Sequence, residues 1–428
     1  MQKQLILEYK GEELSGILIK EDEKYMTLKL KSGYNANIKK SDAKIISEKN
    51  IEIKSNGKTT IKINNSLPKV AILHTGGTIA SKVDYKTGAV SWKFTPEELL
   101  HLYPELLEIA NIDAKMIRNM ASDDMRFEHY NILIDEIEKS IKEGAKGVII
   151  SHGTDTLHYS AAALSYAFEE LSVPIILVGA QRSSDRASSD ASSNLRAAVN
   201  FILHNEKSKE KYNRVGICMH EGISDDSFLI IDGINSKKTH SSRRDSFKQI
   251  NYLPFAIINK KDEVEILRNE ILTNENKKVK HTKFNVKLKI GLIKIHPHSF
   301  PEEFTHLNFY NAVIIEATGL GHLPISQIDE YTKSHSKILE EIKSLVKKDK
   351  KIVIATQCCA GEVCMDVYSP GRILNKTGVL GNRMNLIPET LFMRLAYCLS
   401  KDKKNFEELW NSNLEGFECR SVDVNMDL

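Results

Sequence analysis

Residues 69–81 read KVAILHTGGTIAS, and this stretch decides the fold of the chain. Lys69 to Leu73 is a short aliphatic run, typical of a buried strand in a parallel sheet. It ends in Thr75-Gly76-Gly77-Thr78, where two glycines leave main-chain N–H groups open to close approach. Because open α/β sheets bind ligands at the carboxyl ends of their strands, the stretch predicts a binding loop. A tight turn with incidental hydroxyls remains an alternative for this stretch alone.

The composition of the chain excludes several classes of protein. A length of 428 residues predicts two or three domains. The chain carries 60 basic and 57 acidic side chains, a net charge of +3, which argues against extensive nucleic-acid binding by this chain alone. The first residues, MQKQLILEYKGEEL, are unlike a signal peptide, and no run of about 18 apolar residues occurs. We therefore expect a cytoplasmic protein that does not enter a membrane.

The cysteines indicate neither a disulfide framework nor a metal site. There are six, at positions 218, 358, 359, 364, 398 and 419. They are too few and too scattered for a secreted disulfide-rich protein. Cys358, Cys359 and Cys364 form a cluster, but adjacent cysteines are poor partners for one tetrahedral ion and no matching second pair follows. We expect no metal.

The sequence pattern predicts three domains. Residues 1–66 contain short alternating runs between Gly, Asn and charged turns, the pattern of a small all-β domain. Residues 69–270 alternate strand and helix patterns, which predicts a parallel sheet with helices on both faces. Residues 270–283 are highly charged and predict a linker. Residues 285–428 predict a smaller C-terminal α/β domain.

Two of the predicted strands each deliver a threonine to the same edge of the sheet. The first strand delivers Thr75, and the second, at 147–150, leads into SHGTDT with Thr154 and Asp155. A hydroxyl is a weak nucleophile near neutral pH and needs a base and an orienting group. The threonines and the carboxylate therefore predict a catalytic site, although Thr154-Asp155 could also be a helix N-cap.

The base is expected in the segment NSKKTH, where Lys237 and Lys238 are both candidates. A lysine whose pKa is lowered by burial can accept a proton, and a carboxylate can hold it in place. A surface charge is the simpler interpretation of Lys238 taken alone. The combination of hydroxyls, carboxylate and lysine at strand ends favours catalysis.

Several motifs carry a family resemblance. HTGGTIAS at 74–81, SHGTDT at 151–156 and VGAQRSSDRASSDASSNL at 178–195 resemble the signatures of the L-asparaginase family of amidohydrolases. ASDDM, ATGLGHLP and LIPET agree further along the chain, so that the match covers roughly 69–428. The resemblance implies an α/β, asparaginase-like two-domain parallel-sheet fold, here preceded by a small SH3-like barrel.

Within that family, one branch is more similar than the rest. KSGYN in the N-terminal region, KVDYKTGAVSWKFTPEEL and KKTHSSRRDSF resemble the D subunits of archaeal glutamyl-tRNA(Gln) amidotransferases. This resemblance implies a glutaminase that supplies ammonia to a partner, the E subunit, for conversion of Glu-tRNA(Gln) to Gln-tRNA(Gln). It further implies that ATP and Mg²⁺ belong to that partner, that tRNA(Gln) binds mainly there, and that a homodimer of this chain forms a heterotetramer.

The resemblance also assigns residues. Thr75 stands at the nucleophile position, and Thr154, Asp155 and Lys238 stand at the remaining catalytic positions. Lys237 is one residue out of register with that motif.

Three more positions are expected to bind the glutamine or asparagine substrate. Ser122 and Asp123 match positions that hold its α-carboxylate and α-amino groups, and Tyr85 matches a mobile, site-closing tyrosine. The chain departs from its relatives at Gly361-Glu-Val-Cys364, where they commonly have Gly-x-Val-Asn. The alternatives are a free-standing asparaginase or glutaminase, and a catalytically silent scaffold or tRNA-binding module.

Overall fold

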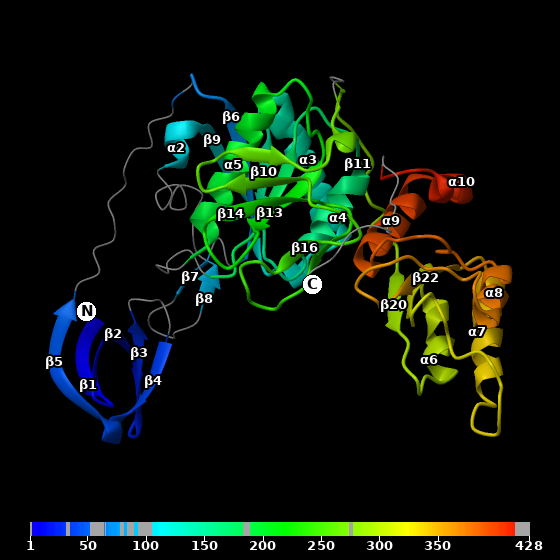
Figure 1. The fold of residues 1–428 in the computed structure, drawn as a ribbon, viewed down its shortest axis with the longest axis horizontal. Helices are drawn as coiled ribbons and strands as arrows, with labels where there is room; N and C mark the ends of the chain where they lie inside the picture. Colours follow the sequence, from blue (N-terminus) through cyan, green and yellow to red (C-terminus); the bar gives the residue numbers. More distant parts are fainter. Residues whose placement is uncertain are drawn as a thin grey trace.

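The computed structural model describes residues 2–30, 35–51, 64, 66–77, 81–83, 90–92, 105–182, 189–273 and 277–415. Its first sheet has five antiparallel strands in the order β4-β3-β2-β1-β5 (Figure 1). Leu5, Leu7, Met26, Leu28 and Ile38 form a small core of their own. The predicted N-terminal all-β region is therefore confirmed. The strands are β1 Gln2–Tyr9, β2 Glu12–Glu21, β3 Tyr25–Leu30, β4 Asn35–Lys39 and β5 Ala43–Ile51.

The second sheet contains eight strands, in the order β18-β17-β14-β13-β12-β10-β6-β9. Five neighbouring strands, from β9 to β13, run parallel, and β14, β17 and β18 run antiparallel. This confirms the predicted α/β fold, with a mixed rather than a fully parallel sheet. The strands are β6 Lys69–Gly76, β9 Asn111–Met120, β10 Val148–Ser151, β12 Ile175–Val178, β13 Val215–His220, β14 Ser227–Asp232, β17 Ala256–Asn259 and β18 Val264–Ile266.

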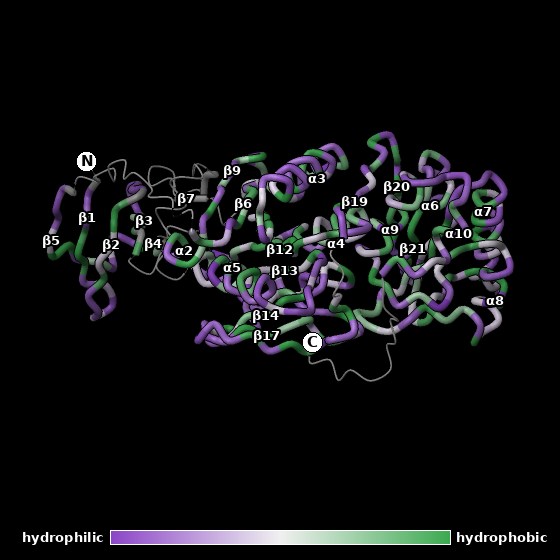
Figure 2. The backbone as a smooth tube through the Cα atoms, turned by 90° about the horizontal axis from the view of Figure 1, so that it is seen from above, coloured by the Kyte–Doolittle hydropathy of each residue, from purple (hydrophilic) through white to green (hydrophobic). Residues whose placement is uncertain are grey.

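Helices cover the second sheet, and their sequences explain how deeply each one is buried. α3 (Phe127–Lys142) buries Tyr130, Leu133, Ile134 and Ile137 along one face, as the helical period requires. Figure 2 shows it at the outside of the molecule with hydrophilic and hydrophobic stretches in alternation. α4 (Leu157–Ala167) is almost entirely buried because its alanines allow α9 (Pro388–Lys401) to pack closely against it. The remaining helices here are α2 Leu106–Ile109 and α5 Ala191–Lys207.

The third sheet is small and parallel, in the order β20-β21-β22. It has a separate core with α7, built from residues such as Val313, Ile315, Ile338 and Ile342. The last two helices leave this core and add Leu391 and Trp410 to the core of the eight-stranded sheet. The elements are β20 Ile290–Lys294, α6 Glu302–Thr305, β21 Ala312–Ala317, α7 His335–Lys347, β22 Lys351–Thr356, α8 Ser369–Lys376 and α10 Phe406–Asn411.

The charged segment predicted as a linker is tied to the large sheet's helices. β19 (Lys280–His281) pairs antiparallel with β11 (Phe168–Glu170), directly after α4. Glu169 accepts a hydrogen bond from Thr282 and forms an ion pair with Lys280. The boundaries at residues 270 and 285 stay a prediction.

The remaining elements are short. β7 and β8 pair with each other, as do β15 and β16. No helix in the part of the chain that the structure describes is long and apolar enough to cross a membrane. These elements are β7 Ser81–Val83, β8 Val90–Trp92, β15 Ser236–Lys238 and β16 Phe247–Gln249, with 3₁₀ helices at Lys40–Asp42, Ser122–Asp124, Asn269–Ile271 and His306–Phe309.

Candidate active site

Two adjacent parallel strands place the threonine loops at one edge of the large sheet. β6 and β10 pair in register, with His74 opposite Ser151, so the residues that follow each strand emerge side by side. Thr75 is buried, and its Oγ1 donates a hydrogen bond to the Ser151 carbonyl at 3.0 Å. The structure therefore holds the Thr75 hydroxyl against the second loop.

Glycines allow three segments of the site to touch. Gly77 has φ +77°, and a Cβ atom there would lie 2.4 Å from Gly153 Cα. A Cβ atom on Gly153 would lie 2.8 Å from Ser122 Cβ. Contacts this close exclude any larger side chain without backbone movement. The glycines thus bring the 75–77 loop, the 151–155 loop and the 3₁₀ helix at Ser122 together, a role that the sequence alone did not indicate.

A lysine from a distant hairpin completes the second loop. Lys238, the last residue of β15, places its Nζ 2.8 Å from Thr154 Oγ1 and 2.8 Å from Asp155 Oδ1. The Lys238 side chain is only 9% exposed, whereas that of Asp155 is 75% exposed. The Lys238 side-chain nitrogen therefore contacts the buried hydroxyl and the solvent-facing carboxylate at once.

The neighbouring lysine points elsewhere. Consecutive side chains of a strand face opposite sides, and Lys237 Nζ lies 2.7 Å from Glu389 Oε1 at the start of α9. Of the two lysines, the structure therefore brings Lys238 to Thr154. The catalytic role of Lys238 stays a prediction.

The LIPET motif anchors the base of this hairpin. Asn235 has φ +55° and is fully buried; its N–H donates to Thr390 Oγ1 at 3.0 Å, and its Nδ2 donates to the Asn385 carbonyl at 2.9 Å. Asn251, just beyond β16, also donates from Nδ2 to the Asn385 carbonyl. The sequence identified this motif only as part of the family resemblance and predicted no contact for it. The asparagines give no local signal, because their partners lie over a hundred residues away.

The predicted substrate-binding residues have different environments. Ser122 is buried; its Oγ accepts from the Thr156 N–H at 3.3 Å and its carbonyl accepts from Thr156 Oγ1 at 2.5 Å. Asp123 is exposed. Both border a cavity of about 440 Å³ beside α3 and α9. Tyr85 lies outside the described residues.

Buried histidines support the loops in neutral form. His152 Nδ1 lies 2.7 Å from the Gly153 carbonyl, which can only accept, so Nδ1 donates and Nε2 accepts from Ser160 Oγ at 2.8 Å. Burial lowers the pKa of His152 and that of His74 to about 4. Neither carries charge at neutral pH. Sequence reasoning passed over both residues.

The cysteine cluster does not form a metal centre in the described part of the chain. Cys358 and Cys359 are exposed and Cys364 is buried. No group of three or more His, Cys, Asp or Glu side chains among the described residues could hold a metal ion.

Family models match most of the chain. The model described as "Asparaginase, N-terminal" matches residues 69–272, and that described as "Glutaminase/Asparaginase C-terminal domain" matches residues 289–410. Solved structures agree. An L-asparaginase from Thermococcus kodakarensis (TM-score 0.69, 24% identity, 81% of this chain and 98% of that chain) shares the fold. L-asparaginase I from Vibrio cholerae (TM-score 0.66, 26% identity, 80% of this chain and 96% of that chain) is also similar.

Curated relatives extend the similarity over the N-terminal region. The D subunit of glutamyl-tRNA(Gln) amidotransferase from Methanococcus vannielii is 39% identical over 94% of both chains. The D subunit from Methanosphaera stadtmanae is 40% identical, over 92% of this chain and 87% of the relative. The one from Pyrococcus abyssi is 36% identical, over 90% of this chain and 84% of the relative. The chain therefore belongs to the asparaginase-type family of glutamyl-tRNA(Gln) amidotransferase D subunits.

Proposed function

We propose that this chain is the glutaminase subunit of a tRNA-dependent amidotransferase. It hydrolyses the side-chain amide of glutamine or asparagine and supplies the ammonia that converts Glu-tRNA(Gln) to Gln-tRNA(Gln). The observation that carries the chemistry is the contact of Lys238 Nζ with both Thr154 Oγ1 and Asp155 Oδ1, at 2.8 Å each.

The amidotransferase assignment rests on how much of this chain each group of relatives covers. The L-asparaginase structures cover 80–81% of this chain, although they are themselves matched over 96–98% of their length. The D subunit from Methanococcus vannielii covers 94% of it. The amidotransferase relatives therefore also match most of the part of this chain that the L-asparaginases leave uncovered.

In the proposed reaction Thr75 is the nucleophile. Its Oγ attacks the carboxamide carbon, and N–H groups of the glycine loops stabilise the oxyanion. The nucleophile's proton passes by way of Thr154 to Lys238, which Asp155 holds in place, and returns to the leaving nitrogen as ammonia departs. Water then hydrolyses the acyl-threonine ester to release glutamate or aspartate.

The substrate's α-groups are assigned to the 3₁₀ helix that borders the cavity. Ser122 and Asp123 hold the α-carboxylate and the α-ammonium group, respectively, and Tyr85 closes over the bound amino acid. Contact between Gly153 and Ser122 keeps this recognition loop in a constant position relative to Thr154.

The partner chemistry lies outside this chain. The E subunit activates the tRNA-bound glutamate with ATP and Mg²⁺ and makes most of the contacts to tRNA(Gln), and two copies of each protein form a cytoplasmic heterotetramer. This chain uses no cofactor of its own in the proposal. Because released ammonia is wasted without an acceptor, the site of the isolated chain is expected to stay largely unproductive until the complex assembles.

The test compares the isolated chain with the complex. Purified chain hydrolyses glutamine slowly, and the cognate E subunit with tRNA(Gln) raises the rate of ammonia release about tenfold or more, since a few kcal/mol are enough to shift the chain from a mostly inactive to a mostly active state. Full-speed hydrolysis that partner and tRNA leave unchanged would instead assign a free-standing asparaginase or glutaminase. No amide hydrolysis under any condition would indicate a silent scaffold.

A further inference from the structure

The turn of the hairpin that carries Lys238 is held by contacts far from its anchored base. This turn, residues 239–246, is exposed over most of its length. Arg244 Nη1 reaches from it to Asp225 Oδ1 at 2.9 Å, and its side chain is largely buried in doing so. Ser246 Oγ accepts from Gln181 Nε2 at 2.7 Å. Both ends of Lys238's strand are therefore attached to the body of the protein.

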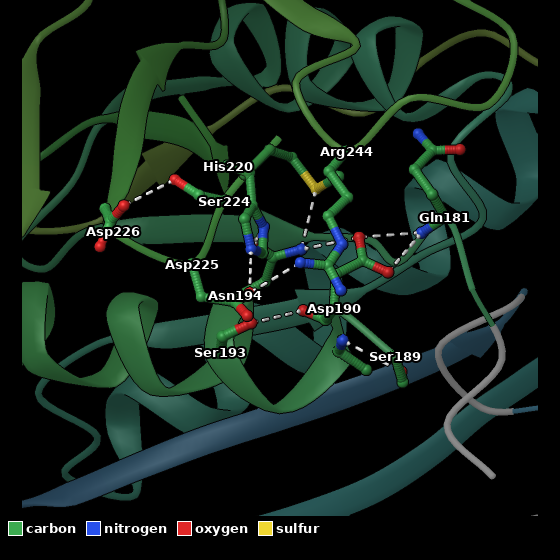
Figure 3. Close-up of polar contacts among 12 residues, drawn as sticks. Gln181, Ser189, Asp190, Ser193, Asn194, His220, Ser224, Asp225, Asp226 and Arg244 are labelled. Carbon is green, nitrogen blue, oxygen red and sulfur yellow. Dashed lines mark hydrogen bonds and ion pairs between the residues drawn. The ribbon is translucent and has the colours of Figure 1, made fainter. Parts of the chain in front are cut away.

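From Asp225 the network of polar contacts continues into the protein through a buried histidine. Asp225 Oδ1 also lies 2.8 Å from His220 Nε2, and His220 Nδ1 lies 2.7 Å from Asn194 Oδ1 (Figure 3). His220 is fully buried, with the Phe228 ring 4.6 Å from its own. Asn194 Nδ2 donates in turn to the Gly179 carbonyl at 3.0 Å.

The network ends directly behind Thr154. A Cβ atom on Gly179 would lie 2.6 Å from Thr154 Cγ2, so the Gly179 backbone packs against that side chain. The chain of contacts thus begins in the turn that follows Lys238, at Arg244, and returns to the side chain whose hydroxyl Lys238 contacts. The distance between Lys238 and Thr154 is therefore constrained at the hairpin turn and at the backbone behind Thr154.

A second route runs parallel to the first. Asp190 is fully buried and accepts hydrogen bonds from the Gln181 N–H at 3.0 Å to each of its oxygens, and from the Arg182 N–H. Figure 3 shows the Asp190 carboxylate between Gln181 and Asn194. The two routes meet at the first turn of α5, where Asn194 Nδ2 lies 3.4 Å from Asp190 Oδ2.

We propose that Asp225 is a positioning residue for amide hydrolysis. Through Arg244 it fixes the turn that follows Lys238, and through His220 and Asn194 it ties that turn to the backbone behind Thr154. The inference rests on the proposed roles of Thr154 and Lys238. An isolated surface ion pair contributes little. Here one carboxylate oxygen joins a largely buried guanidinium to a fully buried imidazole, so its loss releases two groups together.

The chain offers a matched control one residue away. Asp226 is as exposed as Asp225, with 63% of each side chain accessible. Asp226 pairs with Lys260 Nζ at 2.9 Å and with Ser224 Oγ at 2.9 Å, and neither partner belongs to the hairpin. In Figure 3 Asp226 points away from Arg244.

The experiment measures glutamine hydrolysis by the full-length chain. Asp225→Ala is expected to lower kcat about tenfold with KM for glutamine within about twofold, because misplacement of Lys238 affects the chemical step rather than substrate binding. Asp225→Asn keeps an oxygen that can accept both hydrogen bonds and should recover most of kcat. Asp226→Ala should match wild type.

A second variant distinguishes loss of the link from misfolding of Asp225→Ala. Arg244→Ala breaks the same link from the hairpin side and should give a similar loss of kcat, with no further loss in the Asp225→Ala/Arg244→Ala double variant. Wild-type kcat in both single variants, equal losses in Asp225→Ala and Asp226→Ala, or no recovery in Asp225→Asn overturns the positioning role. If Lys238→Met retains activity, the proposed role of Lys238 fails as well; if Lys238 is required and Asp225 is not, only this inference fails.

Discussion

The two halves of the candidate site are built by different means. The strand-end loops, at 75–77 and 151–155, are fixed by backbone packing, with Gly77, Gly153 and Ser122 too close for any intervening side chain. The hairpin at 236–249 is instead fixed by side chains: Asn235 at its base and Arg244 at its turn. The nucleophile therefore belongs to the rigid half and the lysine to the adjustable one.

This difference predicts how the halves respond to change. Backbone packing tolerates almost no substitution, so a variant in the strand-end loops should lose function abruptly or disturb folding. Side-chain tethers can be loosened one at a time, and the hairpin should therefore show graded losses. Regulation of the site through a partner, if it acts on geometry, is easier to achieve at the hairpin.

The largest effect is expected at Thr75. Thr75→Val keeps the shape of the side chain and removes the hydroxyl that donates to the Ser151 carbonyl. Glutamine hydrolysis should fall by about three orders of magnitude or more, since a covalent nucleophile has no substitute. Thermal melting should change little, because one hydrogen bond is worth about 1 kcal/mol. Retention of more than about a tenth of the rate would point to another nucleophile.

The next effect separates the two lysines. Lys238→Met should reduce hydrolysis of glutamine by about two orders of magnitude or more, because Thr154 and Asp155 lose their shared partner. Lys237→Met is the matched control: it breaks only the pair with Glu389 and should keep most of the activity. The reverse result would show that Lys237 reaches the site in solution.

A smaller effect tests the backbone packing itself. Gly153→Ala places a Cβ atom 2.9 Å from Ser122 Oγ and should cost about 1–3 kcal/mol of unfolding free energy, with a loss of kcat/KM. Gly222→Ala, where a Cβ atom meets nothing within 4 Å, should be neutral. Denaturant melts of both variants check this. Equal stability for the two would mean that the loops are not packed as described.

The last prediction concerns the buried histidines near the strand-end loops and the stability of the folded chain at acid pH. Their effect on activity at neutral pH is expected to be the smallest. Burial lowers the pKa of His74, His152 and His158 to about 4 in the folded chain, below the ordinary value of 6.5. The unfolded chain therefore binds more protons, and the free energy of unfolding should fall as pH drops from about 6.5 towards 4. Each histidine contributes on the order of 2 kcal/mol between pH 7 and 5.

Chemical denaturation at the two pH values measures this loss. His152→Asn should have a shallower pH dependence than the unaltered chain, since one titrating group is removed. A free energy of unfolding that is the same at pH 7 and pH 5 would contradict burial of neutral imidazoles under the loops.

Much of the fold could be predicted because local patterns repeat. Aliphatic runs such as 69–73 and 147–150 indicated parallel strands, and their positions in β6 and β10 agree. β9 was not predicted: NIDAKMIRNM mixes charged and apolar residues because it forms an edge of the sheet. The antiparallel pairing of β13 with β14 was also missed. It follows from a connection of six residues, 221–226, which is too short for a crossover.

The site was predictable in its residue types but not in its tethers. Strand ends and hydroxyls pointed to Thr75 and Thr154, since both follow aliphatic runs. The choice between Lys237 and Lys238 depends on which face of β15 meets Thr154, and no local pattern determines that. The contacts of Asn235 with Asn385 and of Arg244 with Asp225 join segments distant in sequence, so only the folded chain reveals them.

The most direct test of the central claim is to trap the acyl-enzyme. The chain is mixed with glutamine, quenched in acid within milliseconds to seconds, digested, and the peptides are weighed by mass spectrometry. The unaltered chain is compared with Thr75→Val, which lacks the attacking hydroxyl and should carry no adduct. The account predicts one glutamyl group on the peptide that contains Thr75. A glutamyl group on another residue, or steady ammonia release with no adduct in the unaltered chain, would contradict it.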